Sequence, residues 1–304
     1  MIVLVCPGQG SQTPGFLAPW LTDPSNQALM EQYSEAAGLD LILHGTESDA
    51  DTIRDTRVAQ PLIVAAGLLT LRALSANGPL SADVGIAGHS VGEITAAVGA
   101  GVLDELAAMR FVAARSTAMA AAAATTPTGM SAVLGGDTDA LLARLDELDL
   151  QPANFNGGGQ IVVAGALDAL AELTAAPLSG TRVIPLQVAG AFHTRYMEPA
   201  RDELASNAHA FQASDPVRPL WTNADGSLVD SGSRFVELLV GQVASPVRWD
   251  LAMESMQAAG VTGIVELAPA GALTGLARRG LKGTPAVAIK TPDDIPAAME
   301  LLAV

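Results

Sequence analysis

Short runs rich in valine and isoleucine alternate along this chain with longer amphipathic stretches rich in alanine and leucine. Four such runs are Ile2 to Cys6, Val84 to Ala87, Pro219 to Thr222 and Ile264 to Leu267. Runs of this kind are typical of buried strands, and apolar residues at helical spacing between them are typical of helices that cover a sheet. The alternation therefore predicts βα units around a mainly parallel sheet, which is an α/β fold.

The order of elements changes between residues 127 and 187. There we predict strand, helix, strand, strand, helix and strand, over Met130 to Leu134, Thr138 to Leu148, Ala153 to Asn156, Ile161 to Ala164, Leu167 to Thr174 and Arg182 to Leu186. This β-α-β-β-α-β order is ferredoxin-like. We expect a large hydrolase-like α/β subdomain from residues 1–126 and 188–304 and an inserted ferredoxin-like subdomain from residues 127–187. A cleft between two such subdomains is a common place for a ligand.

Two long helices are predicted in the large subdomain. Apolar residues recur at helical spacing from Pro61 to Ala76, and Pro61 suits the first turn of that helix. Asp104 is a candidate N-cap for a helix that runs to about Ala124. This second helix carries Arg115 among many alanines, where a lone arginine is typical of a solvated face.

Composition excludes several classes of function. The 16 Lys and Arg residues against 32 Asp and Glu residues give a net charge of −16, which argues against a nucleic-acid binder and against binding to anionic membranes. The run from Ile2 to Cys6 is too short for a signal peptide and has no basic residues before it, so we expect a cytoplasmic protein. The single Cys6 cannot form an intrachain disulfide, and the four scattered histidines lack metal-ligand spacing. We expect no metal site.

The segment Gly88-His89-Ser90-Val91-Gly92 has the spacing of a nucleophile elbow. It follows a predicted strand and precedes a helix-like stretch from Val91 to Ala100, which is the setting that an elbow requires. Glycines allow the tight turn because they carry no Cβ atom. A serine hydroxyl is a poor nucleophile at neutral pH without a base, so Ser90 needs a histidine partner.

His193, in the apolar segment VAGAFHTRYM, is the best candidate for that base. His89 adjoins Ser90 but should point away across the turn, and His44 and His209 lie in polar surroundings typical of a surface. A packed histidine bonded to backbone explains His193 about as well from these residues alone. For an oxyanion, the N–H of Val91 is one donor, and the glycine-rich turn PGQGSQ at residues 7–12 could supply another.

The ordered set of motifs resembles the malonyl-CoA:acyl carrier protein transacylase family over essentially the whole chain, with free-standing bacterial type II enzymes most similar. The motifs are PGQGSQ (7–12), AQP (59–61), GHSVGE (88–93), ANFNGGGQIVVAG (153–165), GAFHT (190–194) and QVASPVRW (242–249). The resemblance implies that Ser90 is acylated and that His193 is the catalytic histidine. It implies further that the main-chain carbonyl of Gln242 orients His193, and that the backbone amides of Gln9 and Val91 form the oxyanion hole.

The resemblance also implies the substrate-binding residues. Arg115 matches the arginine that pairs with the free carboxylate of malonyl, and Phe192 and Asn156 are expected beside it. The family commonly reads Arg-Gly-x-x-Met-Gln at the arginine, whereas this chain has Ser116 next to Arg115 and Ala120 at the last position. Phe192 matches members that accept malonyl instead of bulkier acyl groups.

The function implied is transfer of malonyl from malonyl-CoA to the phosphopantetheine thiol of acyl carrier protein, for fatty acid or polyketide synthesis. No cofactor is expected, and the partners are malonyl-CoA and acyl carrier protein, with no nucleic acid or membrane and a monomeric state. The alternatives are a GxSxG serine esterase or thioesterase of the α/β-hydrolase type and a non-catalytic carrier-binding protein. An α/β-hydrolase usually has its histidine close to the C-terminus, whereas 304 − 193 = 111 residues follow His193 here.

Overall fold

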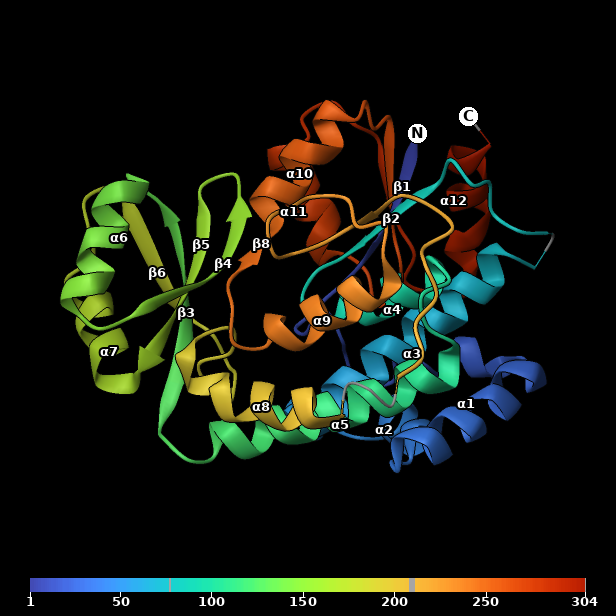
Figure 1. Cartoon of the computed structure of the whole chain (residues 1–304), viewed down its shortest axis with the longest axis horizontal. Coiled ribbons are helices and arrows are strands. Elements are labelled where there is room, and N and C mark those ends of the chain that lie inside the picture. Colours follow the sequence, from blue (N-terminus) through green and yellow to red (C-terminus); the bar gives the residue numbers. More distant parts are fainter. Residues whose placement is uncertain (77, 208–210, 304) are drawn as a thin grey trace.

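The computed structural model describes residues 1–76, 78–207 and 211–303. It has two sheets, each with its own helices (Figure 1). The strands are β1 (Ile2–Cys6), β2 (Gly85–Gly88), β3 (Thr128–Gly135), β4 (Gln151–Gly157), β5 (Gln160–Ala166), β6 (Thr181–Pro185), β7 (Leu220–Trp221), β8 (Val247–Arg248), β9 (Gly263–Glu266) and β10 (Ala286–Ala288). The α-helices are α1 (Pro24–Ala37), α2 (Leu41–Thr46), α3 (Thr56–Leu74), α4 (Gly92–Gly99), α5 (Glu105–Ala123), α6 (Thr138–Glu147), α7 (Leu167–Ala175), α8 (Glu198–Asn207), α9 (Gly232–Gln242), α10 (Trp249–Ala258), α11 (Ala272–Gly280) and α12 (Ile295–Leu302).

The first sheet has the strand order β10-β9-β1-β2-β7, and its neighbouring strands are parallel. The central strand β1 is buried at every residue, which explains its unbroken apolar sequence. The four apolar runs expected to be strands all lie in this sheet, with ends shifted by a residue or two. The predicted mainly parallel α/β fold is confirmed.

The second sheet has the strand order β6-β3-β5-β4-β8 and contains the β-α-β-β-α-β segment from β3 to β6. Its pairs β3–β5, β3–β6 and β4–β5 are antiparallel. Along β5, Ile161 and Val163 pack in one core with helices α6 and α7, whereas Val162 and Ala164 join the main core of the molecule. The sheet is therefore anchored to the rest of the fold through one face. Its last strand, β8, comes from outside residues 127–187 and pairs in parallel with β4.

Helix α3 begins five residues earlier than expected. Asp55 caps it by accepting a hydrogen bond from the backbone N–H of Arg57, and Pro61 lies inside the helix. The prediction of a first-turn proline is wrong because the side-chain cap, not the proline, starts the helix. Helix α3 is long and apolar enough to cross a membrane, but 83% of its apolar window is buried inside the protein. It is a core helix of the fold.

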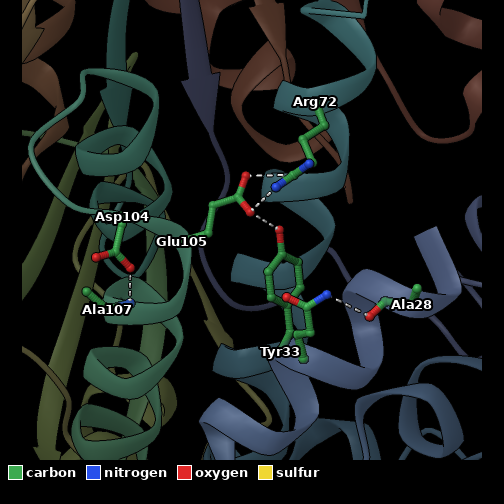
Figure 2. Close-up of polar contacts among 7 residues, drawn as sticks. Ala28, Tyr33, Arg72, Asp104, Glu105 and Ala107 are labelled. Carbon is green, nitrogen blue, oxygen red and sulfur yellow. Dashed lines mark hydrogen bonds and ion pairs between the residues drawn. The ribbon is translucent and has the colours of Figure 1, made fainter. Parts of the chain in front are cut away.

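Helices α3 and α5 pack against each other and against α1, with a polar junction at one end (Figure 2). Glu105, at the start of α5, accepts hydrogen bonds from Arg72 of α3 at 2.7 Å on both oxygens. Tyr33 of α1 donates its hydroxyl to the same carboxylate at 2.6 Å. Asp104 caps α5 by accepting from the backbone N–H of Ala107, as predicted. This junction fixes the start of the helix that carries Arg115.

Candidate active site

Ser90 lies on a tight turn between β2 and α4, which confirms the predicted strand-turn-helix setting. Its φ of 54° is in the left-handed region, as expected of a strained turn. A Cβ atom on Gly88 would lie 2.1 Å from the backbone nitrogen of Glu93, and one on Gly92 would lie 2.1 Å from the carbonyl oxygen of Cys6. Both positions therefore require glycine, because the strand and the helix approach too closely for any side chain.

His193 lies next to Ser90, although 103 residues separate them in the sequence. Ser90 Oγ and His193 Nε2 are 2.7 Å apart, and His193 Nδ1 is 2.8 Å from the main-chain carbonyl oxygen of Gln242. A carbonyl oxygen only accepts, so Nδ1 carries the proton and Nε2 is left free to accept one from the serine. The structure thus brings together the three residues in the geometry that a serine–histidine dyad needs.

Burial lowers the pKa of His193 to about 3, and the positive charge of Arg115 adds to this effect. His193 is 4% exposed, and its backbone is in the left-handed region with a φ of 63°. Its backbone N–H donates to the carbonyl of Val243 at 3.1 Å, so the end of α9 holds both the ring and the main chain of His193. The imidazole is therefore neutral at physiological pH, and its Nε2 is free to accept a proton.

A cavity of about 390 Å³ opens beside Ser90 and is lined by Gln9 and Val91 as well as by His193. Neither backbone N–H, of Gln9 or of Val91, bonds to an acceptor within residues 1–76, 78–207 and 211–303. The side chain of Gln9 donates to the carbonyl of Arg54 at 3.2 Å, which holds the glycine-rich turn in place. Both residues line the cavity with backbone N–H groups that have no acceptor among the described residues, so both amides are candidate donors to a ligand.

Arg115 is buried, with 1% of its surface exposed, so it does not lie on the solvated face that is typical of a lone arginine among alanines. Its Nη1 donates to Gln60 Oε1 at 2.6 Å and its Nη2 donates to Gln242 Oε1 at 2.8 Å. Nη2 also lies 3.4 Å from Ser90 Oγ. Burial lowers the pKa of Arg115 to about 10, with Glu93 opposing the change, so the group stays cationic at neutral pH. A positive charge is thus held beside the nucleophile.

Phe192 and Asn156 also line the cavity, and both are buried. Asn156, on β4 of the second sheet, is bonded through Oδ1 to His89 Nε2 at 2.8 Å and donates through Nδ2 to Gln160 Oε1 at 3.1 Å. His89 therefore pairs with the second sheet instead of with Ser90. The cavity lies between the two sheets, as a cleft between subdomains would.

Of the other two histidines, only His44 falls within the described residues, and it takes no part in this arrangement. His44 is only partly buried and is paired with Ser48 Oγ at 2.9 Å. His209 lies outside the described residues. Within the described ranges, no group of three or more His, Cys, Asp or Glu side chains could hold a metal ion.

Three residues of the site were not assigned a role from the sequence. Asn223 accepts a hydrogen bond from the backbone N–H of Ser90 at 2.7 Å and donates to the carbonyl of Gly88 at 2.6 Å, so it holds the elbow from both sides. Asn223 lies two residues after the end of β7, which neighbours β2, and a polar residue there is the signal that could have identified it. Gln60 and Glu93 belong to the motifs AQP and GHSVGE, and both are buried polar residues.

Comparisons with known proteins agree on one family. The model of the acyl transferase domain matches residues 3–296. A malonyl CoA-acyl carrier protein transacylase of Mycobacterium tuberculosis is 50% identical over 296 residues, which cover 97% of this chain and 98% of that protein. A malonyl CoA-acyl carrier protein transacylase of Escherichia coli strain K12 is 33% identical, with 98% of each chain covered.

Solved structures give the same result. The crystal structure of MCAT from Mycobacterium tuberculosis matches with a TM-score of 0.93 and 48% identity over all of both chains. A type II polyketide synthase acyl carrier protein in complex with its malonyl-transacylase matches with a TM-score of 0.92 and 31% identity over 99% of both chains.

Proposed function

This chain belongs to the acyl transferase family and, within it, to the malonyl CoA-acyl carrier protein transacylases, and on that premise we propose that it carries a malonyl group from malonyl-CoA to acyl carrier protein. The acceptor is the phosphopantetheine thiol of the carrier, and the product supplies extender units for fatty acid or polyketide synthesis. The observation that carries this proposal is the contact of Ser90 with both the neutral His193 and the cationic Arg115.

In the first half-reaction, Ser90 Oγ passes its proton to His193 Nε2 and attacks the thioester carbon of malonyl-CoA. The carbon–sulfur bond breaks, and the proton on His193 is given to the departing CoA thiolate. In the second half-reaction, the carrier thiol passes its proton to His193 and attacks malonyl-Ser90, and the serine oxygen leaves with that proton. His193 serves both steps because the carbonyl of Gln242 keeps its Nδ1 protonated.

Both half-reactions pass through an oxyanion, for which the amides of Gln9 and Val91 are the donors we infer. The start of α4 at the elbow adds the favourable end of a helix dipole. Removing one such donor typically costs about 100- to 1000-fold in rate. The side-chain bond from Gln9 to Arg54 keeps the first donor in place before the substrate arrives.

Arg115 selects malonyl, because its guanidinium can bind the free carboxylate that lies one methylene away from the acyl carbon. An acetyl group would leave this buried charge without an ionic partner. Phe192 and Asn156 line the remaining cavity and limit the size of the acyl group.

We further infer the subdomain organisation expected from the sequence. Residues 1–126 and 188–304 form a hydrolase-like subdomain, and residues 127–187 form a ferredoxin-like subdomain. The antiparallel strand order β6-β3-β5-β4 and the packing of α6 and α7 on one face of this sheet support the second assignment. The strand β8 crosses from the large part to the small one.

The reaction as written needs no cofactor, since the thioester supplies the energy and the protein supplies the nucleophile, base and donors. A cytoplasmic monomer with no nucleic-acid or membrane partner agrees with the net charge of −16.

The proposal is tested by incubating the protein with malonyl-CoA and recording its intact mass, then adding holo carrier protein. We expect one malonyl group on Ser90 that moves to the carrier, and no labelling in Ser90→Ala. An esterase would instead release free malonate without transfer, and labelling that persists in Ser90→Ala would contradict the assignment of the nucleophile.

A further inference from the structure

Glu93 is a buried carboxylate in the first turn of α4, three residues after the nucleophile Ser90. It is 1% exposed, and each of its oxygens accepts a hydrogen bond. Oε1 accepts from the backbone N–H of Asn223 at 2.6 Å, and Oε2 accepts from the side-chain amide of Gln242 in a short contact. The steps of transfer described above do not use this carboxylate.

The two donors to Glu93 are the residues that hold the rest of the site. Asn223 accepts the backbone N–H of Ser90 through its Oδ1. Gln242 donates through Nε2 to the carbonyl of Ser90 at 3.1 Å as well as to Glu93, and it accepts from Arg115 through Oε1. Glu93 is therefore connected by hydrogen bonds to the Ser90 elbow through Asn223 and Gln242, and to Arg115 through Gln242.

The hydrogen bonds from Arg115 to Gln242 and from Gln242 to Glu93 can run in one direction only. A guanidinium has donors and no acceptor, so the amide oxygen of Gln242 must face Arg115. The amide nitrogen of Gln242 then faces Glu93, which must accept. Since Asn223 also donates to Glu93, only a group that accepts on both of its oxygens satisfies every partner. An ionised carboxylate meets this condition, and a side-chain amide does not.

We propose that Glu93, in its ionised form, is a positioning residue that sets the orientation of the Gln242 amide and, through it, the guanidinium of Arg115 for the acyl carboxylate. Glu93 touches neither substrate nor reacting atoms and acts through Gln242. The proposal rests on the proposed function, because it assigns Glu93 to the selection of malonyl over acetyl by the same site.

The first test is Glu93→Gln, assayed above the pKa of about 8 that burial gives Glu93, where the wild-type carboxyl is ionised. The variant keeps the shape of the side chain but replaces one acceptor by a donor. The new amide nitrogen then faces either the N–H of Asn223 or the side-chain NH₂ of Gln242, and two donors cannot bond to each other. The Gln242 amide is no longer held in the orientation that presents its oxygen to Arg115. We expect the malonyl-to-acetyl ratio of kcat/KM to fall roughly tenfold or more, which is the size of effect that one unsatisfied buried hydrogen bond produces. The loss falls on malonyl-CoA, because acetyl-CoA has no carboxylate for Arg115 to bind.

The matched control is Glu266→Gln. Glu266 is 0% exposed and accepts the backbone N–H groups of Leu273 and Thr274 at 2.8 Å, one on each oxygen, at the start of α11. It makes the same use of both oxygens but has no bond to Arg115 or Gln242 within the described residues. In this variant malonyl and acetyl transfer should fall together, and the ratio should stay within about twofold of the wild type.

A double-mutant cycle with Gln242→Met tests whether Glu93 acts through the Gln242 side chain. Methionine removes the amide but keeps the main-chain carbonyl that holds His193. In the Gln242→Met background, Glu93→Gln should lower the ratio no further, because the donor conflict is gone. This double variant also remains informative if Glu93→Gln alone does not fold.

The pH dependence of the ratio gives a second test on the wild-type protein. Burial raises the pKa of Glu93 to about 8, against the lowering effect of the Asn223 and Gln242 donors and of Arg115. Arg115, from α5, and His193, beside the end of α9, are the charged or titratable groups that face this network, and their pKa values of about 10 and about 3 leave Glu93 to titrate between them. The ratio should rise with pH through about 8 and be flat over that range in Glu93→Gln.

An unchanged ratio in Glu93→Gln, or equal losses for both substrates as in Glu266→Gln, would overturn the positioning role and leave the proposed function intact. A wild-type protein that shows no malonyl transfer would instead overturn the proposed function itself.

Discussion

Replacement of Arg115 by methionine should greatly weaken the preference of the enzyme for malonyl-CoA over acetyl-CoA. Arg115 is 1% exposed and its Nη2 lies 3.4 Å from Ser90 Oγ, so an acyl carboxylate beside Ser90 would pair with the guanidinium in a desolvated site. Truncating one partner of a buried, hydrogen-bonded charge pair costs about 2–5 kcal/mol. At about 1.36 kcal/mol for each factor of ten, this predicts a fall of roughly 30- to 5000-fold in kcat/KM for malonyl-CoA.

Acetyl transfer should change far less in Arg115→Met, because acetyl makes no ionic bond to the arginine. The assay is kcat/KM for both acyl-CoAs with the same carrier. Arg110→Met is the matched control, since Arg110 lies on the same helix α5 at an exposed position. A malonyl-to-acetyl ratio that is the same in Arg115→Met as in the wild type would refute the assignment of Arg115 to the acyl carboxylate.

Three further predictions concern the base, the elbow and the helix junction. His193 binds a proton below about pH 6.5 in the unfolded chain but stays neutral down to about pH 3 in the folded protein. The free energy of unfolding should therefore fall as the pH drops from 6.5 to 3, by at most about 1.4 kcal/mol per pH unit from this group. In His193→Gln, the dependence of the free energy of unfolding on pH, measured by urea titration, should be flatter. Asn223→Ala removes the acceptor for the Ser90 N–H, and one lost buried bond of about 1–3 kcal/mol should lower kcat with little change in KM; a changed KM at constant kcat would contradict this. Tyr33→Phe removes one bond to Glu105 and should lower stability by about 1 kcal/mol and Tm by about 2 °C, with an unchanged malonyl-to-acetyl ratio as the check that the junction is structural.

Much of the fold could be predicted from the sequence because local signals and the tertiary structure agree. The apolar runs became the parallel sheet, and Asp104 capped α5 where expected. The prediction failed at Pro61, where a favourable residue for a helix start lies inside a helix that Asp55 begins. The short strand β8 was missed because its two residues become a strand only by pairing with β4 of the other sheet.

The site was predictable where a residue sits inside a local motif and less so where side chains meet across the fold. Ser90 follows from the strand-turn-helix pattern, but the contact of Arg115 with Gln60 and Gln242 joins α5, α3 and α9. An arginine among alanines looks like a solvated residue until these partners are known. Asn223 was missed for the same reason, because its role depends on β7 lying beside β2.

The most direct test of the central claim is the fate of the acyl group on Ser90. After incubation with malonyl-CoA, peptide mapping by mass spectrometry should find malonyl on the peptide that contains Ser90, and holo carrier protein should then remove it and gain the same mass. Free malonate with no malonyl-carrier formed, or malonyl found on a residue other than Ser90, would contradict the account.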